Sequence, residues 1–158
     1  LLNLFLNSYM LLKSNGAKIW GITMMSNPFM MSNSISTSLG VIPAGFYGWI
    51  NDKKMINKIK NDTREDVERS IMYFHRDKII IRYMNITFKT SIRKNEGGIQ
   101  AIMSYQNRIK KEDQYTKKLK KLYPMYCCKE KKGGIRISLT PKRSKKKIKY
   151  VNVLQKLS

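Results

Sequence analysis

The chain has 158 residues, with 32 Lys and Arg against 10 Asp and Glu, and therefore a formal net charge of +22. A compact protein with that excess repels itself, so the composition indicates a polyanionic partner, most simply the phosphate backbone of a nucleic acid. One His and the adjacent pair Cys127 and Cys128 leave too few side chains for a catalytic triad, a zinc site or a disulfide framework. We therefore expect a protein that is not an enzyme, binds no cofactor, metal or small-molecule substrate, and works in a reducing compartment.

The positive charge is unevenly distributed along the chain. Residues 1–51 contain Lys13 and Lys18 and no acidic residue, whereas residues 52–158 carry a net charge of +20. This division predicts two parts with different roles, an extended N-terminal segment and a remainder with a basic C-terminal extension. The two predicted parts are 1–49 and 50–158.

The N-terminal segment is largely apolar. Residues 1–12 are too short to span a bilayer as a helix, and the uncharged run at 19–51 is interrupted by two prolines and a polar stretch. We expect the segment to lie along RNA or a neighbouring protein. The alternative is a membrane-embedded segment of an accessory subunit of an organellar membrane complex. Three close aromatic residues are candidate anchors or the first edge of the core: Phe46, Tyr47 and Trp49.

Residues 61–75 carry a mixed signal. Val67, Ile71 and Phe74 fall on one face of a helix, with an acidic residue in the first turn. The same residues also fit a strand that leads into a turn at His75. The local pattern favours the helix. Its candidate N-caps are Asn61 and Asp62.

Residues 78–88 predict a strand that is buried on both faces, because β-branched and aromatic residues dominate it. The predicted faces are Ile79, Ile81 and Tyr83 on one side, and Ile80, Met84, Ile86 and Phe88 on the other. Two Gly-Gly pairs follow downstream, one before an apolar stretch at 99–103 and one before a strand of alternating pattern at 135–139, which Pro141 ends.

Lysines are concentrated in two runs, at 108–132 and 142–149. A run of lysines is most simply a solvated surface, but two runs in a chain with so few acids favour contacts with RNA phosphates. Three tyrosines interleave with the first run and either pack into the core or stack on unpaired bases: Tyr115, Tyr123 and Tyr126.

The order of several short motifs after residue 50 is similar to that of one known family. The first half of the motifs comprises Asn51-Asp52, Asp62, Arg76-Asp77, Ile79-Ile80-Ile81 and Asn85. The second half comprises Lys89, Arg93, Lys94, Gly97-Gly98-Ile99, Ala101-Ile102, Asp113, Lys117-Lys118, Tyr126, Gly133-Gly134, Ile135-Arg136-Ile137-Ser138 and Lys142-Arg143. Together they resemble the KOW-domain family of the large-subunit ribosomal protein twenty-four, especially its mitochondrial members. The sequence departs from the family at the KOW loop, where glycine and lysine are replaced by Asn61, Thr63, Arg64, Glu65 and Asp66.

The resemblance implies a mainly β fold, a small SH3-like barrel in which residues 61–75 pair as strands. The apolar side of that barrel would be Ile56, Ile59, Val67, Ile71, Ile79, Ile81, Ile99, Ile102, Ile135 and Ile137. It also implies a structural constituent of the large subunit of a mitochondrial ribosome, located in the matrix, which supports subunit assembly. Its partners would be large-subunit rRNA and neighbouring ribosomal proteins, and no membrane.

In this interpretation basic loops reach from the barrel into rRNA grooves, where shape and phosphate contacts dominate recognition. The residues expected to bind RNA are Lys89, Arg93, Lys94, Lys110, Lys111, Lys117, Lys118, Lys120, Lys121, Arg136, Lys142, Arg143, Lys145, Lys146 and Lys147.

Overall fold

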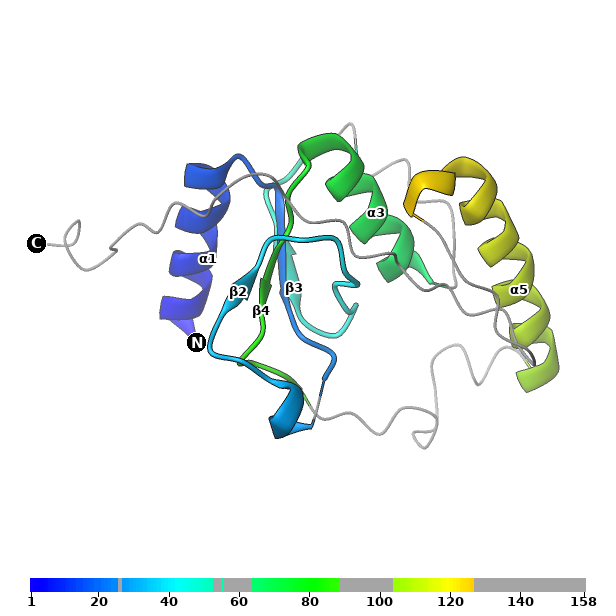
Figure 1. Ribbon diagram of the computed structural model, residues 1–158, viewed down its shortest axis with the longest axis horizontal. Coiled ribbons are helices and arrows are strands. Elements are labelled where there is room, and N and C mark those ends of the chain that lie inside the picture. Colours follow the sequence, from blue (N-terminus) through cyan, green and yellow to red (C-terminus); the bar gives the residue numbers. More distant parts are fainter. Residues whose placement is uncertain (26, 53–54, 56–63, 89–103, 127–158) are drawn as a thin grey trace, which may run out of the picture.

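A four-stranded sheet in the order β2-β4-β1-β3 forms the centre of the computed structural model, which describes residues 1–25, 27–52, 55, 64–88 and 104–126 (Figure 1). The two middle strands, β1 (Ile19–Ile22) and β4 (Ile81–Tyr83), are parallel, with Trp20 opposite Ile81. The outer strands are antiparallel to their neighbours: β3 (Tyr47–Trp49) pairs with β1, and β2 (Ile35–Ser36) pairs with β4. Segments far apart in the sequence therefore meet in one sheet.

Helices cover both faces of this sheet, because apolar residues in and next to the middle strands alternate between two clusters, with Ile19 and Ile80 in one and Trp20 and Ile81 in the other. Helix α1 (Leu2–Asn15) lies on one face, where its Leu11 and Leu12 pack with Trp20, Ile79 and Ile81. Helix α3 (Glu65–Asp77) lies on the other face and packs with Ile19 and Ile80. Figure 1 shows the resulting order of layers, from α1 through the sheet to α3 and then to α5 (Tyr105–Leu122).

Helix α1 ends because Gly16 adopts the left-handed conformation, with φ of 66°, which glycine takes without steric cost. The backbone N–H groups of Gly16 and Ala17 both donate to the carbonyl of Leu12, so the last turn is closed. No helix that the structure describes is long and apolar enough to cross a membrane. Two short 3-10 turns, η1 (Pro28–Met30) and η2 (Pro124–Tyr126), complete the described elements.

Helix α3 confirms the local signal at 61–75 and contradicts the strands that the family resemblance implied. Its first turn carries Glu65, Asp66 and Glu68, whose negative charges favour the N-terminal end of a helix dipole. The helix begins after Arg64, which has a φ of 63°, so the expected caps Asn61 and Asp62 are not its N-cap. All residues from 67 to 74 are buried.

The expectation of a mainly β, SH3-like barrel with an extended N-terminal segment is wrong. The described residues form an open sheet between helices, and residues 1–49 supply α1 and three of its four strands. The strands are too short for a closed barrel, since β2 has 2 residues and β3 and β4 have 3 each. The barrel came from the spacing of short motifs, which contains no information on pairing between distant segments.

The predicted strand at 78–88 is confirmed at Ile81–Tyr83, where Ile81 and Tyr83 are buried on one face and Arg82 is partly buried on the other. Ile79, Ile81 and Tyr83 belong to the cluster under α1, and Ile80 belongs to the cluster under α3, as the alternation predicted. Ile86 and Phe88 pack with the first of these clusters, against expectation. The expected barrel residues Val67 and Ile71 are buried too, but in helix α3. The segments predicted at 99–103 and 135–139, and the core residues Ile56, Ile59, Ile99, Ile102, Ile135 and Ile137, lie outside the described residues.

Candidate nucleic-acid interface

Helix α5 presents one buried side and one strongly basic side. Its N-terminus is capped by Ser104, whose Oγ accepts a hydrogen bond from the backbone N–H of Asn107 at 3.4 Å. Tyr115, Thr116 and Leu119 are buried, at the spacing that places side chains on one face of a helix. The lysines at the remaining positions are therefore directed outward.

The buried side of α5 is attached to α3 by polar contacts. The Tyr115 hydroxyl donates a hydrogen bond to a carboxylate oxygen of Glu68, which is 5% exposed. Glu112 accepts from the guanidinium of Arg64 at 3.1 Å and from Nε of Arg108 at 3.0 Å. These contacts hold the orientation of α5, because a carboxylate buried without partners would be costly.

A Tyr115→Phe substitution tests this attachment. We expect it to lower the free energy of unfolding by about 1–3 kcal/mol, because Glu68 keeps its burial and loses its donor. The measurement is urea unfolding followed by circular dichroism. Tyr9→Phe is the matched control. It removes the same hydroxyl group from a residue that is 51% exposed, where water can take its place. Equal stability of the two variants would contradict the proposed role of the Tyr115 hydroxyl.

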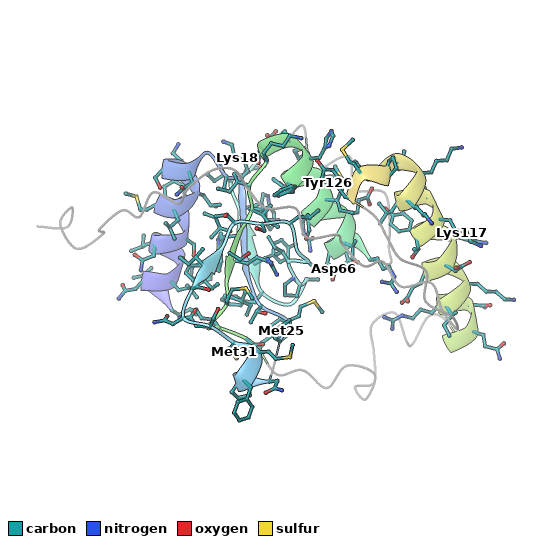
Figure 2. All side chains as sticks on the ribbon, viewed as in Figure 1. Lys18, Met25, Met31, Asp66, Lys117 and Tyr126 are labelled. Carbon is teal, nitrogen blue, oxygen red and sulfur yellow. The ribbon has the colours of Figure 1, made fainter. Side chains whose placement is uncertain are left out.

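The outward side of α5 carries six exposed lysines. They extend over about 16 Å of helix at about 1.5 Å per residue. Figure 2 shows Lys117 on the side of α5 that faces away from the rest of the molecule. The six are Lys110, Lys111, Lys117, Lys118, Lys120 and Lys121.

Acidic side chains neutralise little of this charge. Helix α5 contains seven basic residues and two acidic ones, of which Glu112 is held by arginines on the buried side. Asp113 pairs with Lys117 at 3.0 Å, in an exposed ion pair of the kind that contributes little to stability. No acidic side chain in the described part of the chain forms an ion pair with Lys110, Lys111 or Lys121. This surface therefore suits a polyanion.

The structure brings six of the fifteen residues that were expected to bind RNA onto one helix surface. They were predicted to lie in loops, and the helix corrects that expectation. The reason is that only a few apolar residues mark the helix, between many lysines. The other nine expected residues lie outside the described residues: Lys89, Arg93, Lys94, Arg136, Lys142, Arg143, Lys145, Lys146 and Lys147.

Two of the three interleaved tyrosines pack into the core and are not free to stack on bases. Tyr115 is 7% exposed and Tyr126 is 4% exposed. Tyr123 is partly buried and lies edge-on to the His75 ring, with a centroid distance of 6.0 Å. Burial, and then the negative charge of Glu68, raise the pKa of the Tyr123 hydroxyl. The hydroxyl therefore stays protonated at neutral pH.

Two arginines, one buried and one partly buried, were not anticipated from the sequence. Arg69 is 7% exposed and donates through Nη1 to the Tyr47 hydroxyl at 3.0 Å. Arg82 lies in the middle of the sheet and donates through Nη2 to Ser36 Oγ at 3.3 Å. Neither forms an ion pair with an acid in the described ranges, and burial lowers the pKa of Arg82. Gly40 packs directly on the Arg82 guanidinium, since a Cβ there would lie 2.3 Å from Cζ.

The described residues contain no group of three or more His, Cys, Asp or Glu side chains that could hold a metal ion. The comparisons give no further indication of function: no protein-family model, curated protein or solved structure matches the chain. The candidate site is therefore defined by its own geometry, a helix attached by its buried side and covered with lysines on its outer side.

Proposed function

We propose that the chain is a non-enzymatic RNA-binding protein of a ribonucleoprotein, an organellar ribosome, and that the outer side of α5 binds RNA phosphates. The observation that supports this most directly is the row of exposed lysines on α5 with few acids to neutralise them. The net charge of +22 supports a partner that is itself a polyanion. The compartment in this proposal is the mitochondrial matrix, and the partners are rRNA and neighbouring ribosomal proteins.

A helix with a basic outer side suits contact with the backbone of folded RNA. Lysine is a compact point charge on a flexible stem, so it binds phosphate without reading the base sequence. Each phosphate that a lysine neutralises releases condensed counterions, and the binding then weakens steeply with salt. The expected mode is therefore electrostatic and shape-dependent, in keeping with an assembly in which position is fixed by many neighbours.

The assignment to the large subunit came from the resemblance to the KOW-domain family, and the barrel that this resemblance implied is not present among the described residues. The proposal therefore depends on α5 and on the charge of the chain. The large subunit stays a prediction, which the following experiment tests directly.

Sedimentation of the tagged full-length protein tests the proposed function. In a lysate of the source cells, we expect the protein to migrate with the large ribosomal subunit, and not with the small one, in a sucrose gradient at low salt. We expect release to the top of the gradient after ribonuclease treatment or in about 1 M salt, where counterion release no longer favours binding. Sedimentation at the top at every salt concentration, or release by detergent alone, would contradict the proposal.

A further inference from the structure

Strand β3, at the edge of the described sheet, carries two aromatic rings on one face. Tyr47 and Trp49 are two residues apart in a strand, so their side chains point to the same side. Their ring centroids are 5.4 Å apart and their planes differ by 23°, which is a stacked arrangement. Trp49 is 46% exposed, whereas Trp20 is 3% exposed. Trp49 is thus the solvent-accessible indole of the chain.

A buried arginine fixes the inner ring of this stack. The Arg69 guanidinium carbon lies 3.9 Å from the centroid of the Tyr47 ring, and Arg69 Nη1 donates to the Tyr47 hydroxyl at 3.0 Å. A guanidinium so close over the centroid fills that face of the ring, so the indole of Trp49 stacks on the opposite face. Because Arg69 is 7% exposed, the face of the Tyr47 ring that it covers is held in place.

The stack therefore runs from Arg69 through Tyr47 to Trp49, and its outer member is open to solvent. One face of the indole is covered by Tyr47, while nearly half of the Trp49 surface remains accessible. A flat, preordered aromatic face loses little conformational entropy when a planar ligand is added to it. Unpaired nucleobases bind to such faces, since each base has a π-face that can continue the stack.

We propose that Trp49 stacks on an unpaired nucleobase of the bound RNA, with Tyr47 and Arg69 as the positioning residues behind it. This inference rests on the proposed function and adds a contact to a base, where α5 contributes contacts to phosphates. Charge favours RNA over a protein as the occupant. The only charged residue in the stack is a cation, and the chain as a whole carries +22.

The test compares two single strands of equal length and charge, one of oligouridine and one in which every base has been removed. Binding to the full-length protein is measured at one fixed salt concentration, together with tryptophan fluorescence. We expect the strand with bases to bind roughly 5-fold to 150-fold more tightly than the abasic strand, from the strength of stacking on a single aromatic residue. We also expect that strand alone to quench the fluorescence of the exposed indole.

Two variants assign this preference to the stack. Trp49→Leu should keep the affinity for the abasic strand and abolish the preference for bases, so that the two strands bind about equally. Phe29→Leu is the matched control, since Phe29 is a 98% exposed aromatic residue outside the stack, and it should keep the full preference. Circular dichroism verifies that both variants fold.

Equal binding of both strands by the unaltered protein, without quenching, would overturn the stacking and leave the proposed function intact. A base preference that survives Trp49→Leu would overturn it as well. Failure of both strands to bind at low salt would overturn both proposals.

Discussion

The Ile81→Asp variant is expected to lose its cooperative folded state. Ile81 is 0% exposed in the middle of the sheet and packs in the hydrophobic cluster under α1, which contains no charged residue. A carboxylate there would be buried without a cation or a hydrogen-bond donor to pair with it, and such burial costs several kcal/mol. That cost is similar to the whole stability of a small domain, about 5–15 kcal/mol.

The same substitution at the neighbouring residue, Ile80, would test the core less decisively. Ile80 is also 0% exposed but lies on the other face of the sheet, and strand alternation places Arg82 on that same face. Because Arg82 has no acidic partner among the described residues, it could pair with a carboxylate introduced at position 80. Ile80→Asp is therefore expected to destabilise less than Ile81→Asp.

Urea unfolding followed by circular dichroism measures the effect, in moderate salt that screens the self-repulsion of the chain. Ile109→Asp is the matched control, because it makes the same chemical change on α5 at a residue that is 48% exposed. We expect the control to unfold within about 0.5 kcal/mol of the unaltered protein. A cooperative transition of Ile81→Asp at nearly unaltered urea concentration would show that Ile81 is not in the core.

Local patterns predicted the elements that bury a regular apolar face. The spacing of Val67, Ile71 and Phe74 indicated the helix that is now α3, and the alternation at 79–83 indicated which residues of β4 share a face. Both signals arise within a few residues of the chain, where the periods of helix and strand are directly visible. The resemblance overrode the first of these signals and thereby produced the wrong fold class.

The architecture of the sheet was not accessible in the same way. Strands β1 and β4 pair in parallel across some sixty residues of sequence, with Trp20 opposite Ile81. Strands of 2 to 4 residues are too short to show a period of two, and β1 is buried at all four positions, so it has no polar side. The uncharged N-terminal segment therefore suggested an extension, although it provides the strands that complete the sheet.

The sequence predicted which residues make up the candidate site, but not how they are arranged in space. Counting lysines identified the six on α5, but the few buried positions Tyr115, Thr116 and Leu119 gave too weak an apolar stripe to indicate a helix. The partly buried Arg82 had no sequence signal, because an arginine in an apolar strand is usually expected to extend into solvent. Its environment is set by Gly40 and Ser36, which are remote in sequence.

Replacing Lys110, Lys111 and Lys121 together by glutamine is expected to weaken RNA binding roughly 100-fold at 0.15 M salt. Each lost phosphate contact lowers the slope of log affinity against log salt by about 0.7–0.9. Three contacts therefore remove about 2–3 from the slope and about two orders of magnitude in affinity at that salt. These three lysines form no ion pair with a described acid, so the change removes charge without freeing a carboxylate. Glutamine is nearly as good a helix former as lysine, so α5 should persist.

The matched control carries the same change in net charge outside α5, through Lys13, Lys18 and Lys78 replaced by glutamine, of which Lys78 donates to the Tyr126 hydroxyl in η2 at 3.5 Å. If the outer side of α5 is the interface, the control should lose only a few-fold in affinity and keep its salt slope. The reason is that salt screens the interaction between a phosphate and a lysine that lies more than about 8–10 Å away. Fluorescence anisotropy with a structured RNA, titrated at several salt concentrations, measures both quantities. Equal losses in the two triple variants would mean that total charge, and no particular surface, governs binding. A selective loss in the α5 variant requires phosphates to lie against that helix, because a slope change reports the counterions displaced at the contact itself.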